Sequence, residues 1–210
     1  KRKIMFKKII FLSMSISGSI VYADAIKSLD MFLQNKQITG DFTQTVYGNK
    51  KNRVSLGSMQ ILRPNKFRWE YKDGQLIISN SKDIYIYDKE LKQVTIKKLN
   101  SSLGKSPALL LAGGTNIKKS YTISSGAKSD GLEWVNLNPK TISDNNGFKS
   151  VSMGFAKNTG LLSQMKFIDS FDNKSAISFT NVKVGKEAKT SADDFKFKPP
   201  IGVDIINSDN

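Results

Sequence analysis

Short segments in which apolar and polar side chains alternate make up most of the chain after residue 40. A period of two is typical of strands with one buried and one solvated face. Turn signals such as Asp73-Gly74 and Asp130-Gly131 separate the segments. The predicted strands are Gly40–Tyr47, Val54–Leu62, Lys66–Tyr71, Leu76–Asn80, Asp83–Asp88, Gln93–Lys98, Tyr121–Ser124, Leu132–Leu137, Lys149–Phe155, Leu161–Asp169 and Ala176–Val184. About eleven strands joined by short turns favour an antiparallel sheet curled into a barrel or half-barrel.

A short amphipathic helix is predicted ahead of these strands, from Ala25 to Asn35. Its apolar side chains recur at helical spacing, at Ile26, Leu29, Phe32 and Leu33. A helix followed by many strands gives a mainly β fold of the α+β class.

The segment "KSPALLLAGG" interrupts the run of strands with a second helical signal. Ser106 is an N-cap residue type, Pro107 suits the first helical position, and Gly113 is predicted to supply a left-handed stop. Such a short apolar helix is either a plug in the core or a lid above a sheet cavity with an apolar lining. Both interpretations bury the same side chains, Leu109, Leu110 and Leu111.

The stretch "LRPNKFRWEY" places three aromatic side chains on one face of a strand, because Phe67, Trp69 and Tyr71 alternate with charged residues. This aromatic face either packs as ordinary core or lines a cavity. From the residues alone, Arg63 is interpreted as a solvated residue at the end of a strand that Pro64 terminates.

The chain contains no cysteine and no histidine. This composition excludes disulfides, thiol nucleophiles, Ser-His-Asp catalysis and the commonest transition-metal ligand. We interpret the carboxylates near turns, at Asp169, Asp172, Asp193 and Asp194, as solvated or capping residues. Gly113-Gly114 lacks the lysine and the spacing of a phosphate loop. We therefore expect a protein that is not an enzyme and has no cofactor or metal, with hydrolysis by carboxylates as the alternative.

Residues 1–23 are predicted to form a signal peptide. Lys7 and Lys8 form a basic region, an apolar region runs from Ile9 to Val21, and cleavage is expected between Ala23 and Asp24. The alternative is an N-terminal anchor, which is disfavoured because a spanning helix usually needs about 20 predominantly apolar residues. Residues 24–210 have no repeat or linker, so we expect one exported, soluble domain.

The chain is basic, with 33 Lys and Arg against 18 Asp and Glu. Without the five basic residues of the predicted signal peptide, 28 basic residues remain against 18 acidic ones, a net charge of +10. The lysines are spread along the strands, and export would separate the chain from nucleic acid, so no nucleic-acid partner is expected. Solvated strand faces account for most of the lysines, and contact with anionic membrane surfaces is a secondary interpretation.

Four motifs occur in a fixed order, "DFTQTV", "LRPNKFRWEY", "KSPALLLA" and "FKFKPPIGVDI". Together with the spacing from Gly57 to Arg63, they resemble the LolA family, the periplasmic carriers of outer-membrane lipoproteins. The resemblance implies an incomplete antiparallel β-barrel whose open mouth is covered by short helices, above an apolar cavity. Ala108 and Gln60 stand where the family pattern leads us to expect bulkier or aromatic residues. The lid contact is therefore expected to be looser, or rebuilt from residues 109–111.

The same resemblance assigns roles to particular residues. Arg63 matches the arginine that hydrogen-bonds to lid elements and holds the cavity closed, so it is the expected lid latch. The expected lining of the acyl cavity is Phe67, Trp69, Tyr71 and Phe42. The expected lid residues are Leu29 and Phe32 in the first helix and Leu109, Leu110, Leu111 and Ala112 in the second.

The function implied by the resemblance is that of a monomeric periplasmic chaperone. It would bind the acyl chains of lipoproteins released by an inner-membrane ABC transporter and deliver them to an outer-membrane receptor or to the outer membrane itself. The LolB receptor shares the fold but needs a cysteine after its signal peptide for acylation, and this chain has none. The alternative is an exported half-barrel that binds another lipid or a glycan.

Overall fold

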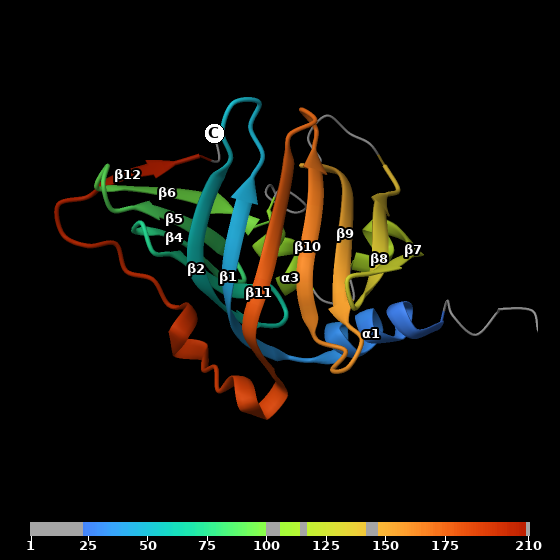
Figure 1. Ribbon diagram of the computed structural model, residues 1–210. Helices are drawn as coiled ribbons and strands as arrows, with labels where there is room; N and C mark the ends of the chain where they lie inside the picture. The colour runs from blue at the N-terminus through green and yellow to red at the C-terminus, as the bar shows by residue number, and fades with distance from the viewer. Residues whose placement is uncertain (1–22, 100–105, 114–116, 142–146, 209–210) are drawn as a thin grey trace, which may run out of the picture.

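One continuous sheet of twelve strands dominates the computed structural model, which describes residues 23–99, 106–113, 117–141 and 147–208 (Figure 1). The strands are β1 (Gln37–Val46), β2 (Arg53–Leu62), β3 (Lys66–Tyr71), β4 (Gln75–Asn80), β5 (Asp83–Asp88), β6 (Gln93–Lys98), β7 (Tyr121–Ser129), β8 (Leu132–Pro139), β9 (Phe148–Ala156), β10 (Leu162–Asp169), β11 (Lys174–Val184) and β12 (Asp204–Asn207). The helices are α1 (Ala23–Gln34), α3 (Pro107–Ala112), α4 (Ile117–Ser120) and the 3-10 helices η2 (Gly185–Ala188) and η3 (Ala192–Phe195). The predicted signal peptide lies outside the described residues except for Ala23, so its cleavage stays a prediction.

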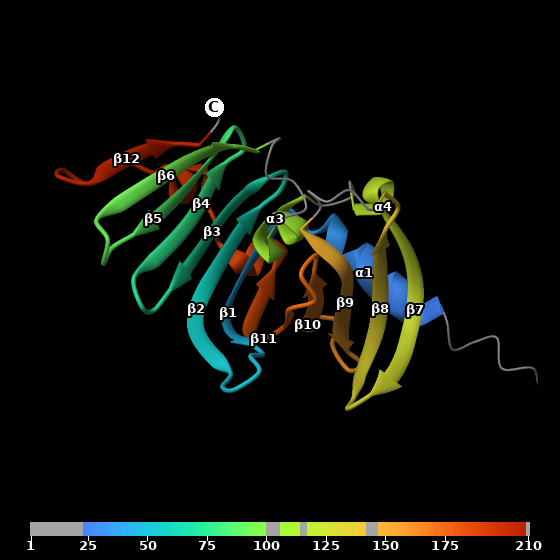
Figure 2. The same cartoon turned by 90° about the horizontal axis from the view of Figure 1, so that it is seen from above.

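The strands follow the order β12-β6-β5-β4-β3-β2-β1-β11-β10-β9-β8-β7. Every pairing is antiparallel except that of β12 with β6, which is parallel. Seen from above, the sheet curls and leaves its edge strands β7 and β12 at opposite ends (Figure 2). The predicted mainly β fold, an incomplete antiparallel barrel, is confirmed.

All eleven predicted strands are present, and the structure adds β12. This strand has four residues, all exposed, so it lacks the alternation that identified the others. It pairs with β6 only because the C-terminal segment returns across the sheet. The predictions also missed α4, η2 and η3, which are each one turn long.

The predicted turns have the backbone that their residues favour. Asp130 and Gly131 have φ angles of 55° and 72° between β7 and β8, and Gly74 has a φ of 99° between β3 and β4. Glycine adopts these left-handed angles at no steric cost, and aspartate does so more readily than most residues. These turns therefore join neighbouring strands as the sequence indicates.

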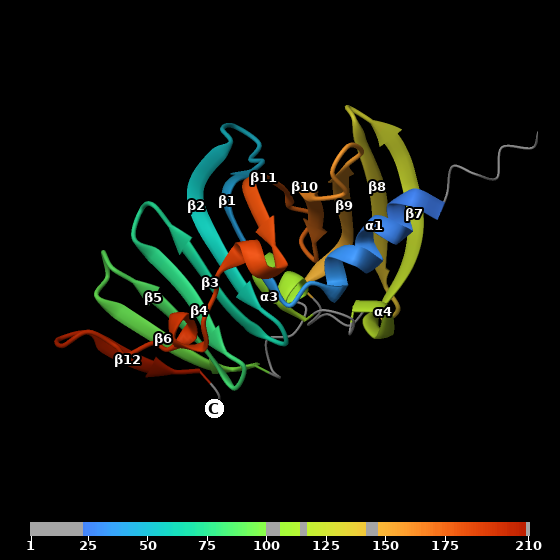
Figure 3. The same cartoon turned by 90° about the horizontal axis from the view of Figure 1, so that it is seen from below.

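Helices α1 and α3 lie along the concave side of the sheet (Figure 3). α1 contacts β7, β8 and β9, whereas α3 contacts β2 and β3. The predicted cap of α3 is confirmed, because Ser106 Oγ accepts a hydrogen bond of 3.2 Å from the Leu109 amide. The predicted left-handed stop at Gly113 is wrong. Gly113 is right-handed, with φ −68° and ψ −15°, because its amide still donates to the Leu109 carbonyl, 2.9 Å away.

The segment after β11 returns across the other half of the sheet. Phe195 of η3 is 1% exposed, and η3 contacts β3 and β4. The Phe197 ring packs against Tyr85 and Tyr87 of β5, with ring centroids 5.4 and 6.0 Å apart. These aromatic contacts hold the returning segment where it can place β12 beside β6.

A hydrophobic cluster of the described residues joins α1, α3, α4 and the inward side chains of the sheet. Members from the helices are Ala25, Leu29, Phe32, Leu33, Ala108, Leu109, Leu110, Leu111, Ala112 and Ile117. Members from the strands include Ile38, Phe42, Met59, Ile61, Phe67, Trp69, Val135, Met153, Phe155, Met165, Ile177 and Phe179. The helices are therefore packed into the core and do not rest on its surface.

Gly57 in β2 leaves no room for a side chain. A Cβ atom there would lie 2.3 Å from the Phe42 ring and 2.3 Å from the Glu70 carbonyl oxygen. We expect Gly57→Ala to lower the free energy of unfolding by about 1–3 kcal/mol, because the ring and the neighbouring strand must move. Urea unfolding followed by circular dichroism measures this change. Gly113→Ala is the matched control, since its nearest atom is 3.3 Å away, and equal losses in both variants would contradict the packing argument.

Candidate functional site

Arg63 lies at the turn between β2 and β3 and is only 9% exposed. Its Nε donates a hydrogen bond of 3.0 Å to the Leu111 carbonyl of α3. Its Nη1 donates to the Phe32 carbonyl of α1, 2.9 Å away, and to the Asn35 carbonyl just beyond α1. Carbonyls at helix C-termini lack partners within their own helix. One side chain therefore joins the ends of two helices to the sheet.

The backbone around Arg63 adds to this connection. The Arg63 amide donates to the Lys36 carbonyl over 2.8 Å, and the Asn65 amide donates to the Ala112 carbonyl over 3.0 Å. The buried Ser79 hydroxyl donates to the Asn65 carbonyl over 2.8 Å. The turn is thus held from three directions, by the chain after α1, by α3 and by β4.

The Arg63 guanidinium has no acidic partner among the ion pairs of the described residues. Its Nη2 is buried without a hydrogen-bond partner in that part of the chain, and its Cζ lies 4.8 Å from the centre of the Phe32 ring. Burial lowers the pKa of Arg63 to about 10, so the group remains charged at neutral pH. Among the described residues, carbonyl oxygens and an aromatic ring compensate this buried charge.

The predicted aromatic face is a set of closely packed rings. Phe42 of β1 stacks on Trp69 with ring centroids 4.3 Å apart, and Tyr71 meets Phe42 edge-on at 5.2 Å. Phe67 and Trp69 are 0% and 2% exposed. Phe179 of β11 joins the set, edge-on to Trp69 at 6.3 Å.

The sequence reasoning missed Phe179 as a member of the aromatic face. The signal was present, because β11 shows the same alternation and Phe179 pairs with Phe42 in the sheet. That register could not be predicted from either strand alone, since it depends on which strands become neighbours.

The predicted lid residues share the core with this aromatic face, but the two helices contact different strands: α3 contacts β2 and β3, whereas α1 contacts β7, β8 and β9. Leu29, Phe32 and residues 109–112 all belong to the same buried cluster as Phe67 and Trp69. The rings that were expected to line a cavity therefore contact one another, and α3 packs beside the strand that carries Phe67 and Trp69. The role of α1 and α3 as a lid stays a prediction.

The two departures from the family pattern lie in different surroundings. Ala108 is 3% exposed inside α3, next to the leucines that fill the core. Gln60 faces the opposite side of β2 from Met59 and Ile61, which are buried beside Trp69 and Phe67. An aromatic side chain at position 60 would therefore point away from α3. The glutamine at this position does not loosen the contact between α3 and the sheet.

A hollow of about 370 Å³ adjoins the aromatic face on the side of Tyr71. Its lining is mostly polar and includes Gln44, Ser55, Gln75 and Asp88. The Tyr71 hydroxyl donates to Gln44 Oε1 over 2.8 Å, and burial raises the pKa of this phenol above its usual value. The inner face of the sheet therefore changes from apolar beside the helices to polar at this end.

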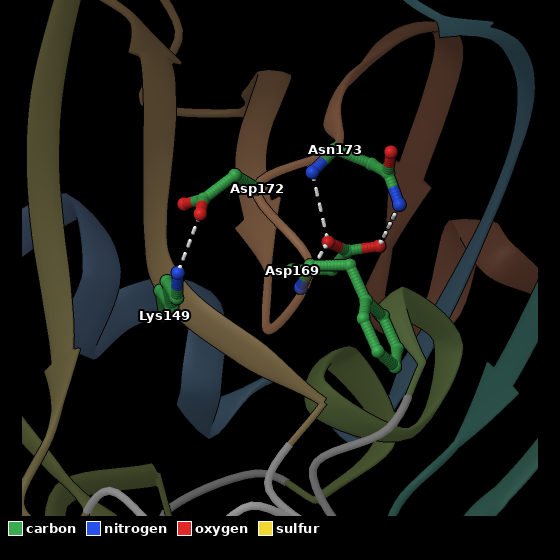
Figure 4. A network of polar contacts seen from close by, with 5 residues as sticks. Lys149, Asp169, Asp172 and Asn173 are labelled. Carbon is green, nitrogen blue, oxygen red and sulfur yellow. Dashed lines mark hydrogen bonds and ion pairs between the residues drawn. The ribbon is translucent and has the colours of Figure 1, made fainter.

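The carboxylates noted in the sequence have structural partners. Asp169 accepts hydrogen bonds from Asn173, and Asp172 forms an ion pair of 2.8 Å with Lys149 (Figure 4). Asp194 caps η3 through the Ser191 amide.

The described residues contain no group of three or more acidic side chains that could hold a metal ion. They also contain no helix that is long and apolar enough to cross a membrane.

The sequence matches a family and several of its members. The family model described as "Outer membrane lipoprotein carrier protein LolA" matches residues 34–198. An outer-membrane lipoprotein carrier protein of Chromobacterium violaceum is 39% identical over 190 residues, which cover 89% of each chain. A protein of the same description from Neisseria meningitidis serogroup C is 34% identical over 207 residues, 97% of each chain. One from Nitrosospira multiformis is 36% identical over 210 residues, covering 98% of this chain and 99% of the relative.

Two solved structures share the fold at low sequence identity. An uncharacterized conserved protein from Thermus thermophilus has a TM-score of 0.52 and 9% identity, covering 87% of this chain and 96% of that chain. A DUF1329 family protein from Desulfovibrio piger has a TM-score of 0.51 and 10% identity, covering 82% and 94%. These similarities concern the fold alone.

Proposed function

Since this chain belongs to the LolA family of outer-membrane lipoprotein carrier proteins, we propose that it carries lipoproteins by enclosing their acyl chains between the sheet and the helices α1 and α3. The observation that carries this proposal is Arg63. This buried charge, which has no acidic partner in the part of the chain that the structure describes, joins two helices to the sheet through hydrogen bonds to backbone carbonyls. Such a connection can break and re-form without any covalent step, as a carrier requires.

Lipid chemistry explains why a protein is needed for this transport. Each methylene of an acyl chain that leaves water gains about 0.8 kcal/mol. The core side chains Phe42, Phe67 and Trp69 offer the apolar surface, and they become accessible when α3 moves away. Cargo would then replace the contacts that α3 makes in the empty protein.

We further propose the partners and the location. Cargo would come from an inner-membrane lipoprotein-releasing ABC transporter and would pass to an outer-membrane receptor or to the outer membrane. The carrier would act as a monomer in the periplasm after cleavage at Ala23, and it would need no cofactor. Members of this family are carriers and not enzymes.

Purification from the envelope tests the proposal directly. The mature protein, isolated without detergent, is expected to hold triacylated lipoprotein that mass spectrometry identifies, and the empty protein is expected to bind a fluorescent fatty-acyl probe that a triacylated lipopeptide displaces. Recovery of only a phospholipid or a glycan, together with failure of the lipopeptide to displace the probe, would contradict it. The unacylated form of the same lipopeptide is the control.

A further inference from the structure

The hairpin between β10 and β11 exposes an aromatic side chain. Phe171 is 84% exposed, whereas the aromatic residues of the core are nearly inaccessible. Tyr47, at the end of β1, is 49% exposed. The two hairpins are joined, because the Tyr47 amide donates a hydrogen bond of 2.9 Å to the Lys174 carbonyl and Val46 pairs with Ser175. The two exposed aromatic residues thus belong to adjacent hairpins, whose turns lie at the same end of the sheet (Figure 1).

Hydrogen bonds and an ion pair hold the turn that carries Phe171. Asp169 Oδ1 accepts hydrogen bonds from the amides of Phe171 and Asn173, both 2.9 Å long. Its Oδ2 accepts another of 2.9 Å from the Asn173 side chain, and Asp172 pairs with Lys149 (Figure 4). The exposure of Phe171 is therefore a property of a defined turn.

The ends of the two hairpins are basic, although Arg53 also lines the polar hollow that contains Asp73, Asp88 and Glu90. Residues 47–53 and 169–174, together with Lys149, hold five basic side chains, Lys50, Lys51, Arg53, Lys149 and Lys174. The same segments hold two acidic side chains. Asp169 accepts hydrogen bonds within the turn, and Asp172 forms an ion pair with Lys149. Beside the hairpins lies a hollow of about 240 Å³ whose lining includes Tyr47, Ile168, Lys166 and Lys174. Apolar surface and ammonium groups therefore lie together.

We propose that these two hairpin ends form a membrane-contact surface that recognises anionic phospholipid. Phe171 and Tyr47 enter the headgroup region, and the basic residues meet lipid phosphates. Aromatic side chains favour this interface, and lysines near it are attracted to anionic lipids. A protein partner is the other occupant that such a surface can have, and the experiments below distinguish it from lipid. The inference goes beyond cargo binding, since acyl-chain capture does not require direct contact between carrier and bilayer.

Vesicle co-sedimentation of the empty protein tests the surface. With vesicles of 70% phosphatidylcholine and 30% phosphatidylglycerol, wild type is expected to bind, and binding is expected to fall with added salt. Phe171→Ser is expected to weaken the partition coefficient at least about fivefold, and Lys50→Gln with Lys51→Gln to weaken it and reduce its salt dependence. Leu91→Ser, at a 68% exposed apolar residue of the β5–β6 turn, is the matched control and is expected to bind as wild type does.

A fluorescent reporter locates the contact independently. Because the chain has no cysteine, Ser170→Cys introduces a single site for an environment-sensitive dye beside Phe171. Its emission is expected to shift to the blue on addition of the phosphatidylglycerol vesicles, whereas the same dye at Glu90→Cys is expected not to respond. An unchanged emission at position 170, or full vesicle binding by Phe171→Ser, would overturn the proposal. The proposal would also be overturned if the emission shifted only after a membrane protein was added to the vesicles. No lipoprotein is present, so the outcome is independent of cargo binding.

Discussion

Arg63→Leu is expected to take up lipoprotein at least as well as wild type but to release it at least about tenfold more slowly. In the empty protein, Arg63 bonds to the carbonyls of Phe32, Asn35 and Leu111, and hydrogen bonds to charged groups contribute about 1.5–3 kcal/mol each. We propose that binding of cargo breaks these bonds, in which case their energy favours the return to the cargo-free form. Loss of even one bond of this strength changes the equilibrium about tenfold, because about 1.4 kcal/mol corresponds to a factor of ten.

A two-step transfer assay measures the uptake and the release separately. Labelled lipoprotein is followed first from inner-membrane vesicles to the carrier and then from the carrier to the receptor or to liposomes. Arg63→Lys is the matched variant, expected to be intermediate because an ammonium group cannot reproduce the fork of donors. Normal release by Arg63→Leu would mean that the buried arginine is structural and not a latch.

Leu110→Glu is expected to weaken binding of a fluorescent fatty-acyl probe at least about tenfold. Leu110 is 5% exposed and belongs to the cluster that joins α3 to the aromatic face. A carboxylate there would have to lose water when acyl chains pack against α3, and burying an unpaired charge is strongly unfavourable. Probe titration of the mature protein at neutral pH measures the effect.

Two further variants separate this effect from a general loss of stability. Leu110→Ala removes buried apolar volume, at a typical cost of about 2–5 kcal/mol, but adds no charge. It is expected to retain most of the probe affinity. Leu91→Glu places the same charge on an exposed residue and is expected to bind as wild type does. Equal affinity of Leu110→Glu and wild type would place the acyl chains away from α3.

Much of the site follows from local sequence. The alternation in β3 correctly predicts that Phe67 and Trp69 share a buried face, and the Ser106-Pro107 pair correctly predicts where α3 begins. Gly113 shows the limit of this reasoning. A glycine after a helix favours a left-handed residue on average, but here the right-handed backbone continues, so the glycine marks the end of α3 without supplying the expected conformation.

Backbone preference and side-chain period act within a few residues, so the eleven predicted strands, the turns at Gly74 and Gly131 and the mainly β class could be read from local sequence. The parallel pairing of β12 with β6 and the packing of Phe179 on Trp69 emerged from the folded arrangement. The same holds for the hydrogen bonds of Arg63 to carbonyls 28 to 48 residues away in the chain. These contacts depend on which distant segments become neighbours when the sheet curls and buries its apolar face. No local pattern encodes the partner of a buried guanidinium.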